Sequence, residues 1–177
     1  MTVVFDGILA FYKRYQTVLE RFVFPALLFL YPFIGVTQGV DVTDTTYSLG
    51  NYEYTPGGDP TWVIATYLPQ VTGRLFMHLP MGNTMRGMNL YCTLFIVAAA
   101  LAAYVLLQCL MPGWTAFAGI FIAESLCWCP RVILYNYMTY FYFTLGPLLL
   151  VRALANETEK KWPFLLAGAC FGLNVTV

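Results

Sequence analysis

The stretch that decides the fold is MNLYCTLFIVAAALAAYVLLQCL, residues 88–110, which contains no charged side chain. As an α-helix these residues would extend about 34 Å, because each residue adds about 1.5 Å along the axis. The hydrocarbon layer of a bilayer is about 30 Å thick, so a stretch of this length and composition predicts a transmembrane helix.

The composition of the whole chain agrees with that prediction. Of its 177 residues, 59% are hydrophobic and only 10% are charged, whereas a soluble domain is about 25% charged. Nine basic and nine acidic residues cancel, so the basic surface of a nucleic-acid-binding protein is missing. Aromatic residues reach 18%, which suits the two membrane–water interfaces. We therefore expect an all-α integral membrane protein without a nucleic-acid partner.

Further apolar segments lie on both sides of residues 88–110. Residues 22–40 are uncharged between Arg21 and Asp41, and Pro112 and Gly113 break the chain after residue 110. The prediction is a multi-span helical bundle with four full spans and the start of a fifth: residues 22–40, 88–110, 113–129, 132–151 and 162–177.

Residues 1–21 carry apolar side chains at steps of three and four, with Lys13, Arg14 and Arg21 off that stripe. This pattern predicts an amphipathic helix that lies on the membrane and leads into the first span. A cleaved signal peptide is the alternative, and the long charged lead without a small-residue cleavage site makes it the weaker one.

Basic residues set the orientation, because they accumulate on the cytoplasmic side of a membrane. Two groups flank the spans on what would be one side: Lys13, Arg14 and Arg21, then Arg152, Lys160 and Lys161. The N-terminus is then cytoplasmic, and the loop 41–87 and the turn 124–131 face outward. The loop is too long for a plain connector. Its first part is rich in turn residues, and we expect one or two short interfacial helices within 61–79, or else a loop folded over the bundle.

Asp41 and Asp44 lie just after the first span, in a region that holds four of the nine acidic residues. On a short helical continuation their i, i+3 spacing would place both carboxylates on one side. Such a pair can act as a general base, bind a divalent metal ion, or end a span as solvated boundary residues. Spacing alone leaves the three readings open.

Glu124 interrupts an otherwise uncharged segment near the outer end of the third predicted span. An ionised group costs about 2.5–3.5 kcal/mol at the bilayer centre, so such residues tend to face a cavity or a partner. Two readings remain open: a structural ion pair with Arg131, or a site shared with Asp41 and Asp44.

The outer loop supplies three cationic candidates for an anionic ligand, Arg74, His78 and Arg86. Arg86 adjoins a span and would more simply snorkel to the interface. Cys127 and Cys129 lack the spacing and the partner pair of a zinc site. The chain has no phosphate-binding glycine motif and no nucleophile-elbow motif of a hydrolase.

Two segments resemble the N-terminal part of GT-C type membrane glycosyltransferases, which use polyprenyl-phosphate-linked sugars. GVDVTDTTYSLGN, residues 39–51, is similar to the first outer loop of that family, with its acidic motif. RALANETEKKWPFLLAGACFGLNV, residues 152–175, resembles its charged cytoplasmic turn and the following span. The chain departs from the family in having Thr45 after Asp44, and in ending where the family continues with further spans. We therefore expect a fragment of a longer enzyme.

The resemblance implies an inverting hexosyl or pentosyl transferase of a bacterial plasma membrane. It would move a sugar from a polyprenyl-phosphate donor to an acceptor on the extracytoplasmic face, in contact with membrane lipids and the missing C-terminal spans. Asp44 would be the general base, and Asp41 or Glu124 would orient the acceptor or bind a divalent metal ion. Arg74 or His78 would neutralise the leaving phosphate.

A non-enzymatic alternative is a small multi-span transporter element, or an accessory protein that scaffolds a membrane complex. A transporter predicts polar residues near mid-span and interrupted helices. Here the mid-span polar residues are few, Thr93, Asn136 and Thr139, while carboxylates gather at the outer ends. This distribution favours the enzyme.

Overall fold

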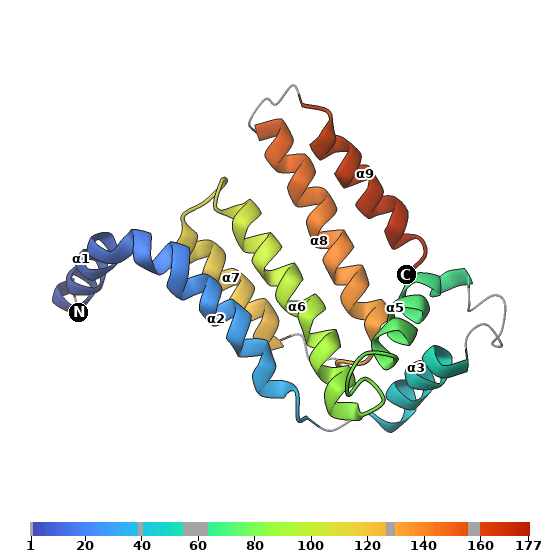
Figure 1. Ribbon diagram of the computed structural model, residues 1–177. Coiled ribbons are helices and arrows are strands. Elements are labelled where there is room, and N and C mark those ends of the chain that lie inside the picture. Colours follow the sequence, from blue (N-terminus) through green and yellow to red (C-terminus); the bar gives the residue numbers. More distant parts are fainter. Residues whose placement is uncertain (1, 39–40, 55–63, 127–129, 156–159) are drawn as a thin grey trace.

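The computed structural model describes residues 2–38, 41–54, 64–126, 130–155 and 160–177, and every regular element in those ranges is helical (Figure 1). Three helical stretches are long and apolar enough to cross a membrane: Leu9–Gly35, Met85–Leu107 and Leu134–Ala155. The expectation of an all-helical protein with transmembrane helices is therefore confirmed at this level.

Two further apolar helices are shorter. Helix α7 (Gly113–Leu126) has 14 residues and α9 (Trp162–Asn174) has 13. At about 1.5 Å per residue, each covers roughly 20 Å, less than the hydrocarbon thickness. The spans expected at 113–129 and from residue 162 therefore stay predictions, and residues 127–129 lie outside the described part of the chain.

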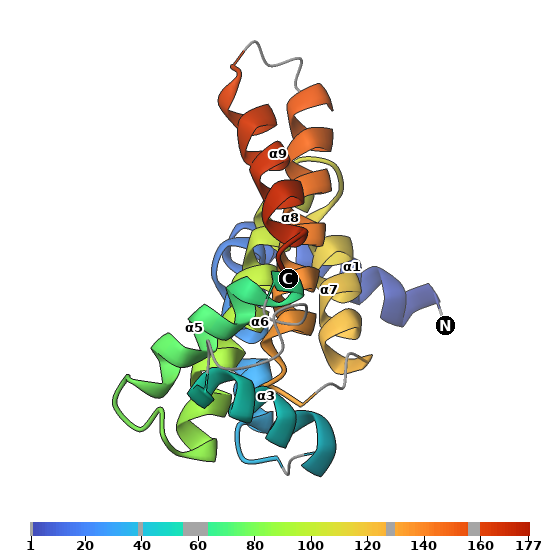
Figure 2. The ribbon, with the colours of Figure 1, turned by 90° about the vertical axis from the view of Figure 1, so that its right-hand side faces the viewer.

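The first helical stretch runs without a break through four elements: α1 (Thr2–Val18), the π-helix η1 (Leu19–Val23), α2 (Phe24–Leu30) and the 3-10 helix η2 (Tyr31–Gly35). Pro25 begins α2 and Pro32 begins η2. Proline cannot donate to the carbonyl four residues earlier and its ring collides with it, so the helix changes its winding at each proline. The apolar window begins at Leu9, inside the segment expected to be interfacial. Helix α1 leaves the bundle at an angle to α2 (Figures 1 and 2).

Residues 42–54 form a helix, α3 (Val42–Tyr54), where the sequence suggested turns. The side chain of Asp41 starts it, because Oδ1 accepts the backbone N–H groups of Thr43 at 2.8 Å and Asp44 at 3.1 Å. Thr45, Ser48 and Tyr52 are buried at helical spacing, so one face of α3 packs against the protein.

Helix α5 (Tyr67–Met77) lies within the stretch where interfacial helices were expected, and it packs on α3 at one end of the bundle (Figures 1 and 2). A methyl group at Gly73 of α5 would overlap the ring of Tyr52, so the glycine permits this close approach. The Tyr52 hydroxyl donates to the carbonyl of Val132 at 2.7 Å, which joins α3 to the turn before α8.

The bundle is built around α6 (Met85–Leu107), which packs on α2, α7 and α8 (Leu134–Ala155). Small residues at the contacts let the helices approach closely. One core cluster joins α2, α6 and α7: Leu28, Ala100, Ala103, Tyr104, Ala116 and Ile120. Helix α9 packs only along α8 among the larger contacts between the described elements, on the side away from α2 (Figure 1).

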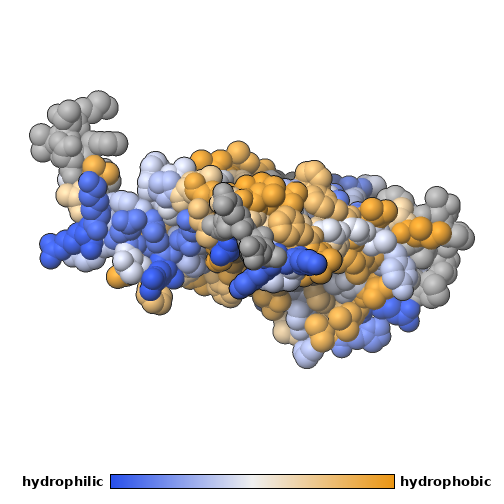
Figure 3. Space-filling model, turned by 90° about the horizontal axis from the view of Figure 1, so that it is seen from above, coloured by the Kyte–Doolittle hydropathy of each residue, from blue (hydrophilic) through white to orange (hydrophobic). Residues whose placement is uncertain are grey.

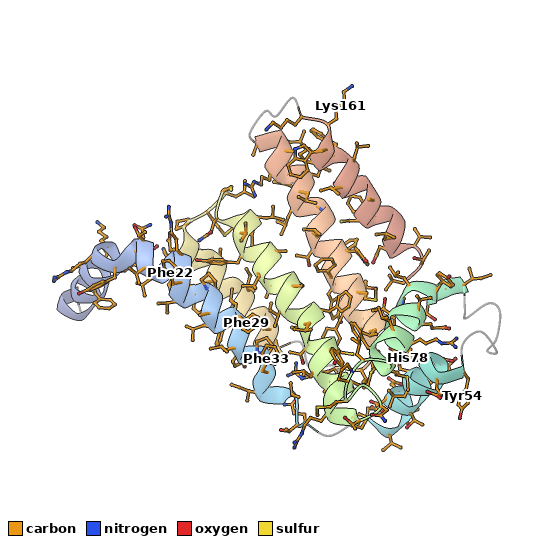
Figure 4. The ribbon with its side chains drawn as sticks, in the orientation of Figure 1. Phe22, Phe29, Phe33, Tyr54, His78 and Lys161 are labelled. Atoms are coloured by element: carbon orange, nitrogen blue, oxygen red, sulfur yellow. The ribbon has the colours of Figure 1, made fainter. Side chains whose placement is uncertain are left out.

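The outer surface is strongly apolar. Phe22, Ile34 and Leu165 are 68%, 76% and 72% exposed. Seen from above, hydrophilic residues concentrate where α1 lies and hydrophobic residues cover much of the middle (Figure 3). In Figure 4, Phe22, Phe29 and Phe33 follow one another along the first helical stretch. A soluble monomer rarely exposes so much apolar surface, whereas a membrane protein presents it to lipid.

Candidate functional site

A cavity of about 980 Å³ lies between the α2–η2 stretch, α6, α7 and α8. Its wall is mostly apolar: Ile96, Ala99, Ala103, Ile120, Phe143 and Leu148 are among the residues that line it. Glu124 and Arg131 are the charged residues of this lining, and Gln38 and Ser125 also contribute. All four belong to the end of the bundle where η2 and α7 finish and α8 begins.

Glu124 and Arg131 are half-buried, and several of their polar atoms are buried without a hydrogen-bond partner among the described residues. Both carboxylate oxygens of Glu124 and the Nε of Arg131 have no hydrogen-bond partner among the described residues. Burial lowers the pKa of the Arg131 guanidinium from its usual value, while Tyr137 and Glu124 act in the opposite direction. Burying polar atoms without partners costs free energy. A ligand that formed hydrogen bonds with these atoms would offset that cost.

The guanidinium of Arg131 is held on its other side. Its Nη1 donates to the hydroxyl of Thr93 at 3.4 Å, and a methyl group at Gly35 would overlap the guanidinium. Thr93 in turn donates to the carbonyl of Asn89 at 2.7 Å, and the Asn89 amide donates to the carbonyl of Val36 at 2.9 Å. The end of η2 and Arg131 are thus both anchored on α6.

Sequence reasoning treated Arg131 only as a partner of Glu124 and passed over Asn89. The signal for Asn89 was present, because Asn89 and Thr93 stand at i, i+4 spacing in an otherwise apolar helix. Nothing in the sequence pointed to Gly35, whose contact with Arg131 arises only from tertiary packing.

Asp41 and Asp44 lie at the same end of the bundle as the charged pair, but neither lines the cavity. Asp41 is occupied in capping α3, and Asp44 is exposed in the first turn of that helix. The Tyr52 hydroxyl ties α3 to Val132, the residue after Arg131. The structure therefore brings the acidic segment beside the turn that carries Arg131, while the expected convergence of Asp41 and Asp44 with Glu124 in one site remains a prediction.

Arg74 and His78 lie on and just after α5, and both are exposed. The Nδ1 of His78 is 2.8 Å from the carbonyl oxygen of Arg74. Neither residue lines the cavity. In Figure 4, His78 lies near Tyr54, across the bundle from Phe29 and Phe33 of the first helical stretch.

The described residues contain no group of three or more His, Cys, Asp or Glu side chains that could hold a metal ion. Glu124 is a single carboxyl group with a guanidinium as its charged neighbour in the cavity lining. The described side chains therefore do not form an all-protein metal site. Asp59, Cys127 and Cys129 lie outside the described residues.

Comparison with known proteins adds no relative: no family model, no curated protein and no solved structure matches the chain. The resemblance of residues 39–51 and 152–175 to GT-C type enzymes stays an expectation from those residues. Function is therefore best inferred from the cavity, its charged pair and the neighbouring acidic segment.

Proposed function

We propose that the chain is part of a membrane glycosyltransferase that moves a sugar from a lipid-linked phosphate donor to an acceptor, at the end of the bundle that carries α3. The observation that carries this proposal is the apolar cavity of about 980 Å³ with a guanidinium and a carboxyl group at one end. Ligand sites are concave and largely apolar, with a few polar groups that orient the ligand. An amphiphile with an apolar chain and a polar, charged head has the matching chemistry.

In this reaction Asp44 takes the proton of the acceptor hydroxyl while that oxygen attacks the anomeric carbon of the donor. The bond between the anomeric carbon and the phosphate oxygen breaks, the configuration inverts, and the lipid phosphate leaves. Asp44 occupies the first turn of α3, where its exposed carboxylate is accessible to an acceptor. Asp41 positions Asp44, because its side chain fixes the start of the helix.

The test is Asp44→Asn in the full-length protein in its native membrane. General-base catalysis contributes about 10²- to 10⁴-fold, so we expect sugar transfer to fall by about a hundredfold or more with an unchanged amount of protein. Glu53→Gln is the matched control, because Glu53 is an exposed carboxylate on the same helix, and it should keep transfer near the wild-type rate. Transfer by Asp44→Asn within a few-fold of wild type would exclude Asp44 as the base. Movement of the lipid-linked sugar without transfer would favour the transporter alternative.

A further inference from the structure

We propose that Arg131 binds the phosphate of the lipid-linked donor and that Glu124 accepts a hydrogen bond from a hydroxyl of its sugar, while the lipid chain lies along the apolar wall of the cavity. This inference rests on the proposed function for the identity of the ligand. It assigns the phosphate to a residue inside the cavity rather than to Arg74 or His78.

Arg131 has the geometry that a phosphate requires. Guanidinium groups bind phosphate with paired N–H donors in a fixed plane. The contacts with Thr93 and Gly35 hold one side of the group, and the buried Nε remains without a partner among the described residues. The bound phosphate would therefore meet a guanidinium that is already ordered and already desolvated.

Glu124 decides which head group fits. A carboxyl group accepts hydrogen bonds from hydroxyl donors, and both oxygens of Glu124 are buried and without a partner among the described residues. A ligand with a phosphate alone would satisfy Arg131 and leave Glu124 unsatisfied. A phosphate that carries a sugar brings an anion for Arg131 and hydroxyl donors for Glu124.

The rest of the cavity suits a hydrocarbon chain. Its volume of about 980 Å³ lies near the top of the range of about 300–1,000 Å³ for ligand pockets. Gly119 of α7 lines it, and a Cβ added there would meet no atom within 4 Å. Open space at Gly119 is room for a ligand, and a large side chain at this position would extend from the lining of the cavity.

Arg74 and His78 are weaker candidates for the phosphate. Arg74 on α5 and His78 just after it are both exposed, and interactions of exposed charged groups are weakened by water. Neither adjoins the apolar cavity that would hold the lipid chain.

The first experiment measures the affinity of the full-length protein in detergent for geranylgeranyl phosphate by titration calorimetry. Arg131→Gln should weaken binding roughly ten- to a hundredfold, the range expected when hydrogen bonds to a charged group are lost. Arg152→Gln is the control at the far end of α8 and should leave the affinity unchanged. Geranylgeraniol, which lacks the phosphate, should bind wild type and Arg131→Gln equally, which also shows that the variant is folded.

The second experiment tests the two ends of the ligand. Gly119→Phe should abolish binding by filling the cavity, and Gly168→Phe on α9 is its matched control, because a Cβ there also meets no atom within 4 Å. Wild type should prefer the glucose ester of geranylgeranyl phosphate to the bare phosphate, and Glu124→Gln should reduce that ratio about tenfold, as expected for one hydrogen bond to a charged group.

An affinity that Arg131→Gln and Gly119→Phe leave within twofold of wild type overturns the proposal. If Arg74→Gln weakened the affinity and Arg131→Gln did not, the phosphate would bind at α5, and the proposal would be overturned as well. If Glu124→Gln does not change the preference for the glucose ester over the bare phosphate, Glu124 does not bind the sugar. Binding is measured without sugar transfer, so the two proposals are tested separately. If Asp44→Asn left transfer unchanged, the proposed function would be contradicted, whereas the binding results would still test the roles of Arg131 and Glu124.

Discussion

At the scale of single residues, Tyr52 joins the outer helices to the turn that carries Arg131. Its hydroxyl donates to the carbonyl of Val132 at 2.7 Å and accepts the N–H of Leu134 at 3.1 Å. Burial raises the pKa of this phenol, so the hydroxyl keeps its proton and its donor role at neutral pH. A single oxygen thereby bonds to two backbone groups of this turn, which also bond to each other, since the N–H of Leu134 donates to the carbonyl of Val132 at 2.9 Å.

We expect Tyr52→Phe to lower the free energy of unfolding by about 0.5–1.5 kcal/mol, because the hydrogen bonds of the hydroxyl are lost while the bond from the N–H of Leu134 to the carbonyl of Val132 remains. Thermal unfolding in detergent, followed by circular dichroism, measures the change. Tyr54→Phe is the matched control, since Tyr54 lies on the same helix and is 76% exposed, and surface changes are usually within about 0.5 kcal/mol. Equal effects of the two substitutions would show that the hydroxyl of Tyr52 does not hold the turn.

The charged pair shows how far sequence reasoning reaches for individual residues. Glu124 stood out because a carboxyl group in an apolar segment needs an explanation. Arg131 could be recognised only as its neighbour in sequence. The guanidinium of Arg131 lies against Gly35 and Thr93, which belong to two other elements. This contact depends on how η2 and α6 pack, and no local sequence pattern encodes such packing.

At the scale of elements, α3 depends on Asp41 for its first turn. Residues 42–54 include Gly50 and several Thr and Ser residues, which have low helix propensity, and the sequence therefore suggested turns. The cap and the buried face formed by Thr45, Ser48 and Tyr52 outweigh that propensity. Tertiary burial made the helix, and burial could not be read from local composition.

Asp41→Ala should cost about 0.5–2 kcal/mol in the stability of α3, and Asp41→Asn should cost little, because asparagine caps helices as well as aspartate does. Hydrogen exchange of peptides from the start of α3 measures this as faster exchange in the alanine variant only. The same pair separates capping from catalysis. If the charge of Asp41 takes part in the reaction, Asp41→Asn will lose sugar transfer while exchange in α3 stays at the wild-type rate.

At the scale of the whole molecule, Glu20 joins three helical segments at the end of the bundle opposite Arg131. Its Oε1 accepts the N–H of Gly113 at 3.1 Å, at the start of α7, and also bonds to the hydroxyl of Tyr12. Its backbone carbonyl accepts the hydroxyl of Tyr104 from α6 at 2.9 Å. Sequence analysis gave Glu20 no role, because its partners Gly113 and Tyr104 lie 93 and 84 residues away along the chain.

We expect Glu20→Ala to lower the free energy of unfolding by about 1–3 kcal/mol, because the N–H of Gly113 and the hydroxyl of Tyr12 lose their acceptor. Glu20→Gln keeps an acceptor oxygen and should lose less. Thermal unfolding in detergent gives the order, with Glu53→Ala as the exposed-carboxylate control. If Glu20→Ala unfolds at the same temperature as Glu53→Ala, the carboxyl group does not join α1 and α7.

The sequence by itself determined the class of the protein. Long uncharged segments can satisfy their backbone hydrogen bonds in a membrane only as helices, so composition and length predicted an all-helical membrane protein, and the three stretches at Leu9–Gly35, Met85–Leu107 and Leu134–Ala155 agree. Only the tertiary structure decided where the cavity lies and that Arg131 and Glu124 share it. A helix-forming pattern is local and repeats along the chain, whereas a cavity depends on side chains from η2, α6, α7 and α8 meeting in space.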